Sequence, residues 1–159
     1  MDYEYCFLEE DLAMNNRSGF TLPELLVAAV VFVLTFVGII YSFIKGMELN
    51  EVSQNTSMAL AASKNRMEAV RNTPFNQIYN TFNNVTFTAA NLTGIGITYV
   101  DNSNPDLFQV KTVFCWRQKN GLIYGEDTNL NGVLNTGEDA NGNNQIDSPV
   151  SLVSYVYNE

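Results

Sequence analysis

The chain has 159 residues, enough for one membrane anchor and one small domain. Its formal net charge of −9 argues against nucleic acid as a main partner, because phosphate binding needs Lys and Arg side chains. The sequence contains no His, which excludes Ser-His-Asp and Cys-His catalytic sites. It also shows no phosphate-cradling loop and no transition-metal cluster. We therefore predict that the protein is not an enzyme.

An uncharged apolar segment runs from Leu25 to Ile44. It has about twenty residues, the length that a helix needs to cross a bilayer core. Pro23 suits the first turn of such a helix, where its missing N–H is not needed. Glu24 is unusual, because an ionised carboxylate at the edge of a span is costly and often has a partner. Two interpretations stay open at this point: a headgroup-facing Glu on an ordinary anchor, or a paired functional group.

The stretch Gly19-Phe20-Thr21-Leu22-Pro23-Glu24-Leu25 resembles the cleavage and N-methylation site of type IV prepilins and type II secretion pseudoprepilins. The resemblance is close over the first third of the chain and extends to the remainder only in architecture. It implies that prepilin peptidase cuts between Gly19 and Phe20 and methylates the new α-amine of Phe20. It also implies that Glu24 faces such an amine, in its own chain or a neighbour's, inside a filament.

Residues 1–19 form the predicted leader, which is unusually acidic for this resemblance. A single basic residue, Arg17, stands against five acidic ones: Asp2, Glu4, Glu9, Glu10 and Asp11. A start at Met14 would leave a short basic leader, so we expect Met14 to be the true start. Cleavage would remove Cys6 and leave Cys115 without an internal disulfide partner.

Residues 20–73 are predicted to form one long helix, with residues 20–44 as the transmembrane and assembly part. Its second half carries a single apolar stripe at spacings of three and four, formed by Val52, Thr56, Ala59, Leu60, Ser63, Met67 and Val70. Pro74 ends the helix, because the residue before Pro disfavours the helical region. We expect the stripe to pack on the chain's own C-terminal domain; a juxtamembrane coiled coil is the alternative.

Residues 74–159 show the alternating pattern of β-strands. The predicted strands are 85–88, 95–100, 108–117, 122–124 and 150–157, with breaks at Gly94 and 101–105, and Asn120-Gly121 predicts a type I′ turn. In the third strand the side chains of Phe108, Val110, Thr112, Phe114 and Trp116 share one face, and those of Lys111, Val113, Cys115 and Arg117 share the other. The predicted fold class is α+β: the pilin-like ladle, with a long helix packed on a small antiparallel sheet.

An insert at residues 126–147 carries the pattern of an EF-hand calcium loop. The predicted oxygen ligands are Asp127, Asn129, Asn131, Val133 through its carbonyl, Asn135 through water, and Glu138, with Gly132 at the sharp turn. An imperfect second repeat offers Asp139, Asn141, Asn143 and Asp147, with Asn144 in place of the glycine and Val150 in place of the closing acid.

The donor set favours Ca²⁺ over Mg²⁺, because every donor is oxygen and the ligands are many. The helices that flank an EF-hand are missing, so we expect a calcium loop within a strand connection. Asp139 or Asp147 could instead join the first ion, and a polar surface loop without an ion is the alternative.

The predicted function is a minor pilin or minor pseudopilin, a structural subunit of a type IV pilus or type II secretion pseudopilus. A looser resemblance of residues 61–75 to minor subunits favours that choice. The expected partners are prepilin peptidase, other subunits and inner-membrane lipid. The precursor would cross the inner membrane once, with its C-terminal domain outside the cytoplasm, before it enters the filament. The alternative is a membrane-anchored, calcium-dependent binding module that does not polymerise.

Overall fold

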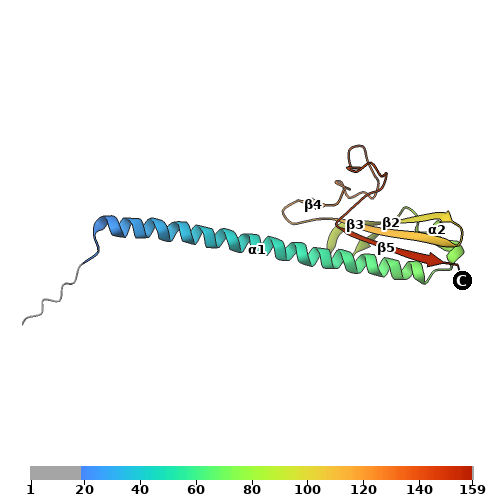
Figure 1. Ribbon diagram of the computed structural model, residues 1–159, viewed down its shortest axis with the longest axis horizontal. Coiled ribbons are helices and arrows are strands. Elements are labelled where there is room, and N and C mark those ends of the chain that lie inside the picture. Colours follow the sequence, from blue (N-terminus) through green and yellow to red (C-terminus); the bar gives the residue numbers. More distant parts are fainter. Residues whose placement is uncertain (1–18, 159) are drawn as a thin grey trace, which may run out of the picture. The chain divides into compact units, whose positions relative to one another are not determined.

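The computed structural model describes residues 19–158, and the predicted leader before Gly19, including Met14 and Cys6, lies outside the described residues. The elements are α1 (Leu22–Arg71), α2 (Phe75–Phe82), β1 (Val85–Ala89), β2 (Leu92–Asn104), β3 (Leu107–Arg117), β4 (Ile123–Tyr124) and β5 (Val150–Tyr157) (Figure 1). The chain divides into two compact units between Phe43 and Ile44, each described by itself below.

The first unit contains the first half of α1, which begins within two residues of the predicted start at Phe20. Leu22 is its first helical residue and Pro23 its second, so the missing N–H of Pro23 falls where no helical partner is needed. The hydroxyls of Thr35 and Ser42 donate to the carbonyls of Val31 and Gly38, at 2.8 and 2.9 Å. These two hydroxyls are thus satisfied within the helix, as a lipid environment requires.

The second unit contains an antiparallel sheet of five strands. β1 pairs with β2, and β2 pairs with β3. The other side of β3 is shared: β5 pairs with residues 107–114, while β4 pairs with Trp116 and Arg117. All five strands expected from the alternating pattern are present, so the predicted antiparallel sheet is confirmed.

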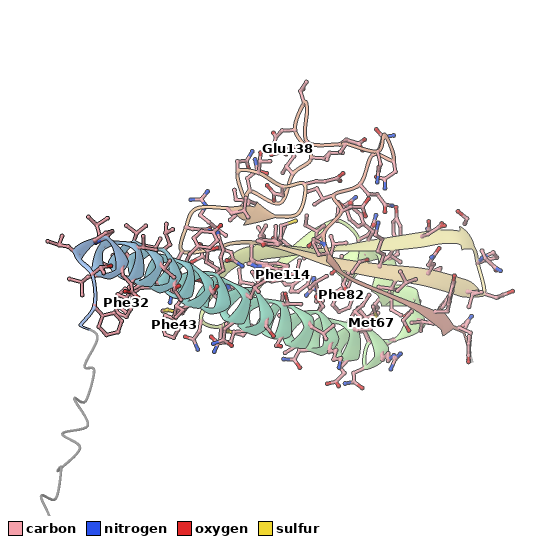
Figure 2. The ribbon with its side chains drawn as sticks, turned by 60° about the vertical axis from the view of Figure 1, so that its left-hand side comes forward. Phe32, Phe43, Met67, Phe82, Phe114 and Glu138 are labelled. Carbon is pink, nitrogen blue, oxygen red and sulfur yellow. The ribbon has the colours of Figure 1, made fainter. Side chains whose placement is uncertain are left out.

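One face of this sheet packs against the second half of α1 (Figure 2). Met67 and Val70 of α1 form a cluster with α2 and the sheet residues Val100, Phe108 and Val110. A second cluster joins Ala59 of α1 to Leu92, Phe114, Trp116 and Val150. Burying one such large apolar side chain contributes about 1.5–3 kcal/mol. The α+β, pilin-like arrangement is therefore confirmed, with the striped half of the helix on the sheet.

The structure differs from the sequence-based expectation in three local features. α2 was not predicted; Phe75, Ile78 and Phe82 lie at helical spacing and turn one apolar face into the core. β2 extends from Leu92 to Asn104, so it contains the predicted break at Gly94 and most of the predicted break at 101–105.

The predicted type I′ turn is also wrong. Gly121 has φ +87°, but Asn120 does not have a positive φ, and the Gly121 N–H donates to the Gln118 carbonyl at 2.9 Å. Only one residue of the Asn-Gly pair therefore takes the left-handed conformation, whereas a type I′ turn needs both.

The opposite face of the sheet is covered by the insert between β4 and β5. Ile146 is buried against Ile97, Val113 and Cys115, and Leu130 and Leu134 pack on the same cluster. Figure 1 shows this coil on the side of the sheet away from α1. The sheet is thus the middle of three layers, although the insert has few apolar residues. Burial raises the pKa of the Cys115 thiol to about 11, so the thiol stays protonated at neutral pH.

Candidate functional site

The residues of the predicted processing site lie at the N-terminal end of α1. Gly19 and Phe20 precede the helix, and the Phe20 side chain is 82% exposed. Glu24 lies in the first turn of α1 and is exposed. A carboxylate in a first helical turn is favoured by the helix dipole.

An exposed apolar surface follows Glu24 along the helix. Large apolar side chains from Leu25 to Ile44 are between 46% and 71% exposed, and Figure 2 shows Phe32 and Phe43 projecting from the helix. Within residues 19–158, α1 is the one helix long and apolar enough to cross a membrane. Such a surface requires lipid or other protein around it.

The second candidate site is the first loop of the insert, residues 127–138. Asp127 at its start is fully buried. Its two carboxylate oxygens accept hydrogen bonds from the backbone N–H groups of Asn131 and Gly132, at 3.1 and 2.7 Å. Gly132 has φ +76°, so the predicted sharp turn falls at the glycine. The loop is thereby folded around its first acidic residue.

Glu138 closes the same loop and is only 7% exposed. Its Oε1 accepts from both the hydroxyl and the backbone N–H of Thr128, at 2.7 and 3.0 Å. Its Oε2 accepts from the backbone N–H of Asn135 at 2.9 Å. The Thr128 hydroxyl is the main cause that lowers the pKa of Glu138 to about 2, although burial opposes it. The side chain is therefore held as a carboxylate.

Oxygen atoms of three predicted ligands meet at the side-chain amide of Asn135. Its Nδ2 lies 2.9 Å from the Val133 carbonyl, 3.0 Å from Glu138 Oε2 and 3.4 Å from Asn131 Oδ1. The side-chain oxygen of Asn129 does not join this group. It accepts a hydrogen bond from the Asn131 N–H at 3.0 Å and so stabilises the turn. The structure thus brings Asn131, Val133, Asn135 and Glu138 together.

The second loop, residues 139–150, repeats this hydrogen-bond pattern. The Asp139 carboxylate accepts from the backbone N–H groups of Asn143 and Asn144, at 3.1 and 2.9 Å. These donors stand four and five residues after the acid, as Asn131 and Gly132 do in the first loop. Asn144 has φ +58°, so it takes the left-handed conformation that Gly132 takes in the first loop.

Lys111 of β3 enters the second loop from the sheet. Its Nζ lies 2.6 Å from Asp147 Oδ1 and 3.1 Å from Gln145 Oε1. The other oxygen of Asp147 accepts from the side-chain amides of Asn141 and Asn143, each at 2.7 Å. Burial raises the pKa of Asp147, but these hydrogen bonds outweigh it and hold the pKa below its usual value. Lys111, which lies outside the insert, thus supplies the positive charge that pairs with Asp147 in the second loop.

Sequence reasoning missed two of the residues that shape the insert. Lys111 was placed on the correct face of β3, but nothing in the sequence linked it to Asp147, 36 residues away. Thr128 occupies a position that the calcium-loop pattern leaves unspecified. No group of three or more His, Cys, Asp or Glu side chains suited to a metal occurs within the described part of the chain, so amide and carbonyl oxygens would have to complete a cation site there.

Residues 14–40 match the family described as the prokaryotic N-terminal methylation motif. No curated protein and no solved structure matches the chain. The matched segment includes Gly19, Phe20 and Glu24 and most of the exposed apolar part of α1. The individual roles of these three residues stay predictions. The chain thus carries a prepilin motif of the type IV pilin and pseudopilin type, on a pilin-like α+β fold.

Proposed function

We propose that the chain is a minor pilin or minor pseudopilin, a structural subunit of a type IV pilus or a type II secretion pseudopilus. The observation that carries the proposal is the methylation motif at residues 14–40, placed at the start of a helix with an exposed apolar surface. The same surface suits lipid before assembly and neighbouring helices afterwards. A structural role also agrees with the absence of His from the sequence.

Prepilin peptidase would cut between Gly19 and Phe20 and methylate the new amine. The precursor would cross the inner membrane once through residues 20–44, with the C-terminal domain outside the cytoplasm. After assembly, Glu24 would face the α-amine of Phe20, in its own chain or a neighbour's. An unpaired charge in such a water-poor interior costs several kcal/mol, so this pairing would fix the register between subunits.

One observation supports a minor over a major subunit. Residues 61–75 have a looser likeness to minor subunits, and they form the end of α1 and its connection to α2. The insert adds a polar layer on the sheet face away from α1. The alternative function, a membrane-anchored and calcium-dependent binding module, would keep the anchor and the insert but would not polymerise.

Replacing Glu24 tests the proposal directly. In the native host, Glu24→Gln should be made and cleaved, but its amount in sheared filaments should fall at least about tenfold, because the amine loses its counter-charge. Glu68→Gln is the matched control, since Glu68 is exposed on the same helix and lies outside the motif. Immunoblots of the sheared and membrane fractions measure incorporation. Wild-type incorporation of Glu24→Gln would contradict the proposed pairing, and absence of the wild-type chain from filaments would favour the binding module.

A further inference from the structure

We infer that the first loop of the insert binds one Ca²⁺ per chain, and that the ammonium group of Lys111 takes the place of a second ion in the second loop. This inference goes beyond the proposed function, because it concerns the insert alone and holds whether or not the chain polymerises. The expected stoichiometry is one Ca²⁺ per chain, although the sequence contains two similar loops.

The two loops can be compared position by position, because they are structural repeats twelve residues apart. Asp127 and Asp139 occupy the same place and accept equivalent backbone hydrogen bonds. Leu134 and Ile146 also occupy equivalent positions, and both pack on the cluster formed by Ile97, Val113 and Cys115. The two loops therefore share their turn and their apolar anchor and differ after it, because Glu138 closes the first loop, whereas its counterpart Val150 is the first residue of β5.

The loops differ in how their negative charge is compensated. Asp127 and Glu138 are both more than nine-tenths buried, and no Lys or Arg among residues 19–158 forms an ion pair with either. In the second loop Asp147 is less buried and pairs with Lys111 at 2.6 Å. Hydrogen bonds from within the loop stabilise both carboxylates, but all of these donors are neutral, so the two negative charges of the loop are not neutralised. The first loop is thus the one that lacks a positive charge.

The first loop also has oxygen atoms aimed at a common position. Asn131 Oδ1, the Val133 carbonyl and Glu138 Oε2 surround the Asn135 amide nitrogen, which carries a partial positive charge. A cation at this position would take the place of that nitrogen. Rotation of the Asn135 side chain would then present its own oxygen, directly or through water.

The donor set favours calcium among the common divalent cations. Ca²⁺ accepts six to eight oxygen ligands in a flexible arrangement, and neutral carbonyl and amide oxygens serve it well. Mg²⁺ needs a near-ideal octahedron at about 2.0–2.1 Å and keeps several waters. The loop offers two carboxylates with amide and main-chain oxygens, spaced as in the twelve-residue calcium loop.

The test counts the ions on the full chain. The protein in detergent micelles is stripped with a chelator, dialysed, and titrated with CaCl₂ in a calorimeter, and the ions are counted by native mass spectrometry. One ion per chain is expected, together with a melting temperature raised by about 5 °C or more at a hundred times the Kd. Zero ions would overturn the first half of the inference. Two ions would overturn the role given to Lys111.

Matched variants assign the ion to its loop. Glu138→Gln should weaken binding at least a hundredfold, whereas Asp147→Asn should keep one ion with a Kd within about threefold of wild type. The reverse result would overturn the assignment. Lys111→Met should raise the stoichiometry to two at millimolar calcium, and an unchanged count of one would show that Lys111 does not hold the place of an ion. If Glu138→Gln does not fold, the number of ions on the wild-type chain and the calcium binding of Asp147→Asn still test the assignment of the ion to the first loop.

Discussion

Gly96 of β2 lies directly opposite Phe87 of β1, and its missing side chain makes room for an aromatic ring. A Cβ on Gly96 would overlap the Phe87 ring. That ring also lies 5.7 Å from the Phe114 ring and 5.5 Å from the guanidinium carbon of Arg66. One glycine thus allows β1 and β2 to place an aromatic side chain between the sheet and α1.

Gly96→Ala is therefore expected to destabilise the domain. The Phe87 ring would have to move, and overpacking of this kind lowers the free energy of unfolding by about 1–3 kcal/mol. Adding Phe87→Leu should recover part of this loss, because it removes the overlapping atoms. Urea denaturation followed by fluorescence of the buried Trp116 measures both variants. Wild-type stability of Gly96→Ala would show that the ring position is not tightly constrained.

At the scale of elements, α1 illustrates what the sequence could predict. Five of its residues are buried, namely Asn55, Ala59, Ser63, Met67 and Val70. The last four belong to the predicted stripe, because helical periodicity is a local property that the sequence records directly. Asn55 was not predicted, and Val52, Thr56 and Leu60 are only half-buried. Hydrophobicity marks the buried face, but the exact line of contact depends on the sheet.

Met67→Ala tests the buried line on α1. Met67 packs with α2 and β3 residues, so its truncation should lower the free energy of unfolding by about 2–5 kcal/mol. The neighbouring Glu68 is exposed, and Glu68→Ala should change the free energy of unfolding by no more than about 0.5 kcal/mol. Trp116 fluorescence in urea again gives the measurement. Equal effects of the two variants would contradict the packing of this half of α1 on the sheet.

The short and the distant features were harder to predict. α2 has only eight residues, too few to separate helical from alternating patterns. The calcium-loop pattern was recognisable because all its residues lie within one short segment. The pairing of Lys111 with Asp147 joins two segments through the fold, and a single sequence carries no record of such a contact. Prediction therefore succeeded for the long helix and the alternating strands, and it failed for α2 and the turn at Gly121. Contacts made through the sheet were beyond its reach, and calcium binding stays a prediction.

At the scale of the whole molecule, composition separates an apolar anchor from an acidic remainder. Residues 25–44 have no charged side chain, while the whole chain has a net charge of −9. An acidic, polar domain does not enter a bilayer, so α1 is the one helix among residues 19–158 that is suited to anchor the chain. This separation agrees with the proposed single crossing of the inner membrane.

The proposed orientation can be checked by protease access. In spheroplasts of cells that make the chain, external protease should degrade the part from Ile44 onward and leave the anchor in the membrane. A tag at the C-terminus follows the loss on an immunoblot, and a cytoplasmic protein serves as the control for lysis. Protection of the tag in intact spheroplasts, with degradation only after lysis, would place the domain inside the cell.

The two ends of the insert meet the sheet at almost the same place. Tyr124 is paired with Trp116 and Val150 with Phe114, and these two residues of β3 are separated only by Cys115. The Glu126 N–H also donates to the Asp147 carbonyl at 2.8 Å, which closes the base of the insert. Because the ends are already joined, segments of other lengths could be grafted there at small entropic cost. A graft would need apolar anchors equivalent to Leu130, Leu134 and Ile146, or it would leave Val113 and Cys115 open to water.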